Sequence, residues 1–230
     1  MPAPSRFVEW INANVGFNPR AGKYSVALSG FVVDDLKDRS SAIRGALASG
    51  SLVLEADADV ATPSLERNID MVLWTGSSPK SRQVALAVEN KLILAAHGKA
   101  RKNRLGDIVA FSNHIHNANR RAVVGGLIVV NLSAEYENPD PFADGMTRPT
   151  FVMENVVRDT VDIYARLPQR SSAESPHDQP EAFGVFVVRY DGTSAATLVT
   201  DAPAPLPGHV LHYDTFLRRL AAQYEERTRP

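Results

Sequence analysis

The sequence predicts an α/β protein with a mixed central β-sheet flanked by helices. Short apolar runs with the length of strands alternate with longer segments whose apolar residues recur at helical spacing. The chain has 230 residues, of which 44% are hydrophobic, so it can bury a full core. We therefore expect a single domain over residues 1–230, with a core at about 30–132 and an extension of the sheet and helices at about 150–230.

The first half of the chain predicts a series of helix, hairpin strands, helix and strand. A short amphipathic helix at 1–15 precedes this series, because Glu9 and Asn12 interrupt its apolar residues. The polar connection at 75–83 contains Gly and Pro, which is typical of a hairpin. The expected elements are a helix carrying Val32, Leu36, Ile43 and Leu47, strands at 69–74 and 84–91, a helix at about 105–117 and a strand at 122–131. Gly125-Gly126 in the last strand indicates a bulge or close backbone packing rather than a ligand loop.

The second half extends this arrangement. Asp191-Gly192 is a hairpin signal between two apolar runs. The polar, Ser-rich and Pro-rich stretch at 168–180 predicts a mobile loop. The expected elements are a helix at 151–167, strands at 183–190 and 195–200, an extended connector at 201–208 and a helix at about 213–227.

Charged residues lie at the ends of the two hairpin strands. Alternation along a strand places Glu89 and Lys91 on one face and Asn90 on the other. If the strands pair as a hairpin, Asp70 comes within a few ångströms of Glu89. Two carboxylates with a lysine form a hard-oxygen site for a divalent ion, typically Mg²⁺, with an ammonium group ready to orient a water or neutralise a phosphate.

A structural interpretation of the same residues is also open. Glu-x-Lys is common at a solvated strand end, and Asp70 could accept backbone hydrogen bonds at a turn. However, Asp70 is second in an otherwise apolar run of six residues, 69–74. An unpaired ionised carboxylate there would cost several kcal/mol unless a cation or donor compensates it. This favours the metal site.

The pattern Asp-x(18)-Glu-x-Lys, with Ile69 in the place of a proline, resembles the PD-(D/E)xK nuclease superfamily, which includes many type II restriction endonucleases. The resemblance covers about residues 30–132, where the order of helix, hairpin strands, helix and strand is that of the family's core. It implies a restriction-endonuclease-like fold. It also implies a Mg²⁺-dependent DNA endonuclease that hydrolyses phosphodiester bonds in restriction or anti-phage defence, with Mn²⁺ able to substitute.

The resemblance also implies a role for each site residue. Asp70 and Glu89, with the Asn90 carbonyl as an additional ligand, would hold the metal, and Lys91 would orient or help deprotonate the attacking water. Some members of the superfamily supply a third carboxylate from the upstream helix. Asp35 is the candidate for that position here, with Glu66 as an alternative in place of a helix residue.

A basic segment, residues 97–104, follows the Glu-x-Lys strand. The net charge of the chain is −1, which gives no overall attraction to DNA. The distribution of charge matters more than its sum, because a local positive segment can bind phosphates. Positive charge at a helix amino terminus is unfavourable with the helix dipole, and this favours a phosphate partner over a solvated helix start. The predicted DNA-binding residues are Lys99, Arg101, Lys102 and Arg104.

Composition limits the remaining possibilities. The absence of cysteine excludes disulfides, thiolate zinc sites and cysteine nucleophiles. No apolar run has the length needed to span a bilayer, and the amino terminus does not resemble a signal peptide, so we expect a cytoplasmic protein without membrane contact.

Two further expectations concern assembly and function. One such site cuts one strand at a time, so cleavage of both strands at a symmetric sequence predicts a homodimer. The alternative functions are a non-cleaving nucleic-acid-binding or assembly module of the same fold, and a nuclease that acts on DNA-repair intermediates.

Overall fold

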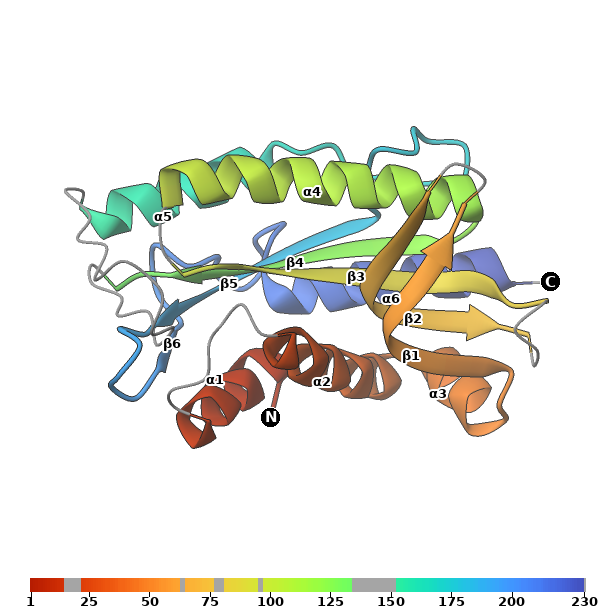
Figure 1. The fold of residues 1–230 in the computed structure, drawn as a ribbon, viewed down its shortest axis with the longest axis horizontal. Coiled ribbons are helices and arrows are strands. Elements are labelled where there is room, and N and C mark those ends of the chain that lie inside the picture. The colour runs from red at the N-terminus through yellow and green to blue at the C-terminus, as the bar shows by residue number, and fades with distance from the viewer. Residues whose placement is uncertain (15–21, 63–64, 77–80, 95–96, 134–151, 230) are drawn as a thin grey trace.

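The computed structural model describes residues 1–14, 22–62, 65–76, 81–94, 97–133 and 152–229. Three helices come first and three strands follow, after which helices and strands mostly alternate (Figure 1). In chain order the elements are α1 (Ala3–Ala13), α2 (Lys23–Arg39), α3 (Ser41–Ala48), β1 (Leu52–Ala61), β2 (Glu66–Thr75), β3 (Gln83–Ile93), α4 (His97–Ala118), β4 (Val123–Asn131), α5 (Met153–Ala165), β5 (Ala182–Arg189), β6 (Thr197–Val199) and α6 (Tyr213–Thr228). None of the helices in these ranges is both long enough and apolar enough to cross a membrane.

The six strands form one sheet in the order β1-β2-β3-β4-β5-β6. β1, β2 and β3 are antiparallel neighbours, and β3, β4 and β5 run parallel to one another. β6 pairs antiparallel with β5 at the far edge. The predicted α/β class with a mixed central sheet flanked by helices is therefore confirmed.

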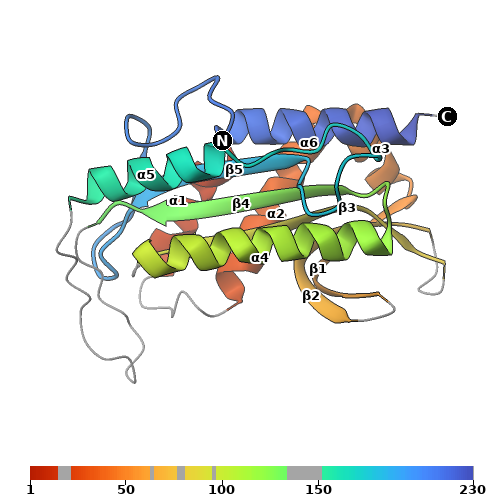
Figure 2. The same ribbon diagram turned by 90° about the horizontal axis from the view of Figure 1, so that it is seen from above.

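Helices cover both faces of the sheet (Figures 1 and 2). α4 and α5 lie on one face, and α1, α2, α3 and α6 lie on the other. The two glycines of β4 permit this packing: a Cβ on Gly125 would lie 3.0 Å from Phe216 of α6, and one on Gly126 would lie 3.0 Å from Ile108 of α4. The expected close backbone packing is confirmed, because neither helix could approach a larger residue at these positions.

Three elements differ from the prediction. The upstream helix is two helices, because Ser40 ends α2 and its Oγ accepts a hydrogen bond from the Ile43 N–H to begin α3. β1 was not predicted. Its acidic residues and its exposed Val53 and Leu54 interrupt the alternation of apolar and polar residues that is typical of a strand. α4 begins at His97 rather than near 105, so the basic segment forms its first two turns.

The hairpin of β1 and β2 curls toward α4 (Figure 1). The curl begins at Asp57, which has a left-handed φ of 50° and lies opposite Asp70. Beyond it, the Val60 carbonyl accepts a 2.8 Å hydrogen bond from the His114 ring of α4. The last backbone pair between β2 and β3 is Met71 with Val88. β2 and β3 therefore separate at Asp70.

Candidate active site

The Asp70 carboxylate lies where β2 and β3 separate. Its Oδ2 accepts a 2.7 Å hydrogen bond from the backbone N–H of Asn90, so a side chain continues the strand pairing that the backbone has ended. From α2, Ser25 donates a side-chain hydrogen bond to the same carboxylate. Ser29 donates to the Asp70 carbonyl at 3.2 Å. Two serines one helical turn apart therefore fix Asp70 from below the sheet.

The environment of Asp70 disfavours its ionised form. Burial raises the pKa of this carboxyl, and the charge of Glu89 raises it further. The hydrogen bond from Asn90, the charge of Lys91 and the hydrogen bond from Ser25 oppose this rise without cancelling it. Asp70 and Glu89 are thus close enough to repel each other, as the hairpin register predicted.

Glu89 is the most buried charged group of the site, with 4% of its side chain exposed. Its Oε1 lies 2.5 Å from Nζ of Lys91 and 3.5 Å from a guanidinium nitrogen of Arg67. Its Oε2 is buried and has no hydrogen-bond partner among the described residues. A buried carboxylate oxygen without a partner costs free energy, and such an atom in a folded protein calls for a missing ligand.

Asn90 connects the site to the helix below. Its amide donates a 2.9 Å hydrogen bond to Ser29 Oγ, on the α2 side of the sheet, as alternation from Glu89 predicts. Its backbone N–H points to the β2 edge of β3, toward Asp70. The N–H and C=O of one strand residue point to the same edge, so the Asn90 carbonyl also faces the space between the separating strands.

The basic segment lies beside this space. Arg104 forms a 2.9 Å ion pair with Asp107 one turn later in α4, and the Asp107 carbonyl accepts a 3.4 Å hydrogen bond from Arg67, which contacts Glu89. The Nε atoms of Arg101 and Arg104 are buried without a partner among the described residues, and Lys102 is exposed. The side chain of Lys99 lies outside the described part of the chain.

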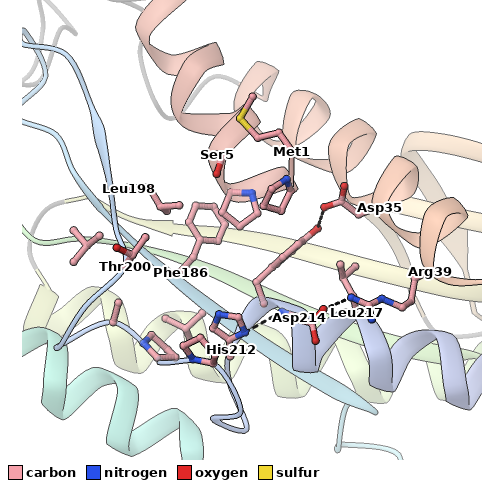
Figure 3. Close-up of a pocket in the computed structure, with 18 of the residues that line it drawn as sticks. Met1, Ser5, Asp35, Arg39, Phe186, Leu198, Thr200, His212, Asp214 and Leu217 are labelled. Carbon is pink, nitrogen blue, oxygen red and sulfur yellow. Dashed lines mark hydrogen bonds and ion pairs between the residues drawn. The ribbon is translucent and has the colours of Figure 1, made fainter.

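Asp35 serves a different part of the molecule. Its carboxylate accepts hydrogen bonds from the Ala3 N–H at 2.6 Å, from Arg6 at 2.5 Å and from the Tyr213 hydroxyl at 2.8 Å. It lines a cavity of about 730 Å³ between the amino-terminal helices, β5, β6 and α6 (Figure 3). The proposed third carboxylate is therefore not supported at Asp35, because these contacts occupy both of its oxygens. Glu66 is exposed at the start of β2.

The acid that the structure places next to Asp70 is instead Asp57 of β1. It lies opposite Asp70, and its pKa is raised by burial and then by the Asp70 charge. Sequence reasoning missed it together with Ser25, Ser29 and Arg67. The two serines carried a signal, namely polar residues four apart on a helix whose neighbouring positions Leu28 and Val32 are buried.

No sequence pattern indicated that Arg67 belongs to this site. It is three residues from Asp70, so strict alternation assigns it to the opposite face of β2. The curl of the hairpin changes this assignment: Ile69 packs with Val72 in the cluster on the α4 side, whereas Met71 packs on the α2 side. Alternation therefore fails at Asp70, and Arg67 reaches the α4 side, where Glu89 lies.

These residues fit a hard divalent cation. Two carboxylates, one with an oxygen that has no partner, and a backbone carbonyl are oxygen donors of the kind that Mg²⁺ prefers, and Mg²⁺ keeps several waters when few protein ligands are available. Within the described ranges no three or more His, Asp or Glu side chains are grouped as a metal cluster.

Comparisons of the chain with protein-family models, with curated proteins and with solved structures found no match.

Proposed function

We propose that the protein is a Mg²⁺-dependent DNA endonuclease of the PD-(D/E)xK type, acting in restriction or anti-phage defence. The observation that carries the proposal is the buried Glu89 carboxylate, with Lys91 on one oxygen and no described partner on the other, beside Asp70 at the separation of β2 and β3. The order α2, β1 to β3, α4 and β4, with β4 parallel to β3, is consistent with the family's order of elements.

Each residue has a task that its contacts support. Asp70, Glu89 and the Asn90 carbonyl bind the metal, for which Mn²⁺ substitutes. The bound ion supplies positive charge that stabilises the phosphate as its charge develops and lowers the pKa of water. Lys91, next to Glu89 and one-fifth exposed, orients the attacking water and helps to remove its proton. The basic segment holds the DNA backbone next to this site.

Cleavage of supercoiled plasmid with Mg²⁺ tests the proposal. Wild-type protein should cut, and Asp70→Asn, Glu89→Gln and Lys91→Ala should each lower the rate at least about a hundred-fold while the protein stays folded. Glu55→Gln is the matched control, since Glu55 of β1 forms a 2.7 Å ion pair with Arg82, which directly precedes β3 at the end of that strand away from Lys91. Wild-type turnover in any of the three variants would remove that residue from the mechanism.

The form of the product tests assembly and the alternatives. A homodimer has two sites and should convert the plasmid directly to the linear form, whereas accumulation of nicked circles would indicate one site acting alone. DNA binding without cleavage by the wild type would favour the non-cleaving binding module. A strong preference for branched or single-stranded substrates would favour the repair nuclease.

A further inference from the structure

Arg67 is a second cation on the Glu89 carboxylate. Its guanidinium lies 3.5 Å from Glu89 Oε1, and the same nitrogen donates a 3.4 Å hydrogen bond to the Asp107 carbonyl of α4. The side chain is about one-quarter exposed, so it lies at the boundary between the buried carboxylate and solvent. It also spans from β2 to the helix that carries the basic segment.

The charges of the site nearly balance without a divalent ion. Asp70, Glu89 and the neighbouring Asp57 supply three negative charges when ionised, and Lys91 and Arg67 supply two positive charges. A divalent ion added to this set gives an excess of positive charge in a partly buried space, and that excess is reduced by displacing a cation or by binding an anion. DNA phosphate is the anion that the proposed function brings to this place.

Of the two cations, Arg67 is the one held more weakly. Lys91 is 2.5 Å from Oε1, whereas the two contacts of Arg67 are 3.4 Å and 3.5 Å long. Hydrogen bonds of that length with charged groups are well outside their optimum. The planar guanidinium can form two parallel hydrogen bonds with a phosphate, which a lone carboxylate oxygen shared with a lysine does not offer.

We propose that Arg67 is a substrate-binding residue that screens Glu89 while the metal is absent and moves to a DNA phosphate when a divalent ion binds the other oxygen of that carboxylate. This inference rests on the proposed function, because it assigns a partner to a residue of the same site. It predicts that Arg67 has opposite effects on two measurements: it weakens metal binding in the absence of DNA, and it promotes cleavage in the presence of DNA.

The test is the affinity of the protein for Mn²⁺, measured by titration calorimetry without DNA, together with the rate of plasmid cleavage. Arg67→Gln should bind Mn²⁺ about five-fold more tightly or better, because a competing positive charge has been removed at short range. Its cleavage rate should fall about ten-fold or more. A residue that only supports the fold would weaken both.

Two further variants complete the design. Arg82→Gln removes an arginine directly before β3 that pairs with Glu55 and stacks on Trp74, and it should leave Mn²⁺ affinity and cleavage unchanged. Arg67→Lys keeps the charge, so its Mn²⁺ affinity should stay within about two-fold of wild type, while cleavage falls because an ammonium lacks the planar fork.

The outcomes separate this inference from the proposed function. If the wild type binds Mn²⁺ and Glu89→Gln abolishes that binding, but Arg67→Gln binds no more tightly than wild type, the role of Arg67 is wrong and the nuclease site stands. Full cleavage by Arg67→Lys would also contradict it. If the wild type has no Mn²⁺ binding that depends on Glu89, both the metal site and the role of Arg67 are wrong.

Discussion

Asp70 and Glu89 are arranged in a way that costs the metal-free protein stability. Asp70 is half-buried near a second carboxylate, and both effects raise its pKa. An acid whose pKa is raised by folding destabilises the folded state once it ionises. The cost is therefore absent below the ordinary pKa of 3.8 and grows as the pH rises through the raised value. A cation bound at the proposed site would remove this cost.

Asp70→Asn should therefore stabilise the protein without metal. The amide keeps an oxygen that accepts from the Asn90 N–H and loses the charge that Glu89 repels. We expect a gain of about 1 kcal/mol at pH 7, or a rise in Tm of roughly 2–4 °C for a chain of this length. The gain should vanish in thermal unfolding at pH values below 3.8, where Asp70 is protonated in both states.

Asp191 is the matched control, because folding lowers the pKa of its carboxyl instead of raising it. Backbone hydrogen bonds from Ser194 and Thr193 lower its pKa to about 2, so its ionised form stabilises the folded state at neutral pH and this contribution is lost as the pH falls toward 2. Asp191→Asn should lower Tm at pH 7. If Asp70→Asn lowered it as well, the repulsion assigned to Asp70 would be contradicted.

How far the sequence predicts single residues depends on where regular geometry holds. The placement of Asn90 on the face opposite Glu89 follows from alternation, and the proximity of Asp70 to Glu89 follows from the hairpin. The predicted role of Asp35 as a third metal-binding carboxylate was wrong. Its carboxylate contacts Arg6 and Tyr213, which come from elements distant in sequence. Such contacts leave no periodic signal in the chain.

At the scale of elements, α4 and the β1–β2 hairpin together determine what lies next to Asp70 and Glu89. The hairpin curls onto α4, and Arg67 and His114 connect the two. The sequence predicted β2, β3 and β4, because their apolar runs are short and bounded by turn residues. It missed β1, whose exposed residues outnumber its buried ones, since pairing with β2 rather than burial makes it a strand.

The basic segment should contribute to DNA binding through phosphates. Replacing Arg101, Lys102 and Arg104 together with glutamine should weaken binding and lower the slope of log affinity against log salt by about 0.9 for each phosphate that the variant no longer binds. Binding of a duplex at several salt concentrations measures this slope. A matched control removes Lys37, Arg39 and Arg44, which lie on α2 and α3 on the opposite face of the sheet.

The comparison of the two triple variants is decisive for this surface. If the control changes the slope as much as the variant in α4, the effect reflects overall charge rather than a contact surface. An unchanged slope for the α4 variant would mean that these side chains face bulk water and that DNA binds elsewhere.

At the scale of the whole molecule, a buried charge cluster fixes the end of α4 that is far from the basic segment. The Glu181 carboxylate at the start of β5 contacts His116 of α4, Arg170 and Arg227 of α6, and it accepts the backbone N–H of Val124 at 2.6 Å. Burial raises the pKa of Glu181, but the hydrogen bond and charge of His116, the charge of Arg227 and the Val124 N–H outweigh it and lower the pKa.

This cluster also includes Arg170 of the segment at 168–180, for which the sequence predicts a mobile loop. Arg170 is fully buried and donates hydrogen bonds to the carbonyls of Arg120, Ala173 and Ser175 as well as pairing with Glu181. Most of the segment is exposed or half-buried, as its polar composition predicts, whereas Arg170 is buried and connects it to the core. The overall order of elements was thus predictable from local patterns, whereas the contacts between distant residues that hold the elements in place were not.

Manganese bound in a crystal of the wild-type protein, located by its anomalous scattering, tests the central claim most directly. The proposed metal site predicts one ion between the carboxylates of Asp70 and Glu89. The ion should bind the Glu89 oxygen that has no partner among the described residues, with the Asn90 carbonyl as a further ligand. Lys91 should remain beside Glu89. A crystal in which manganese binds only at other positions, while Lys91 and Arg67 remain paired with Glu89, would contradict the claim.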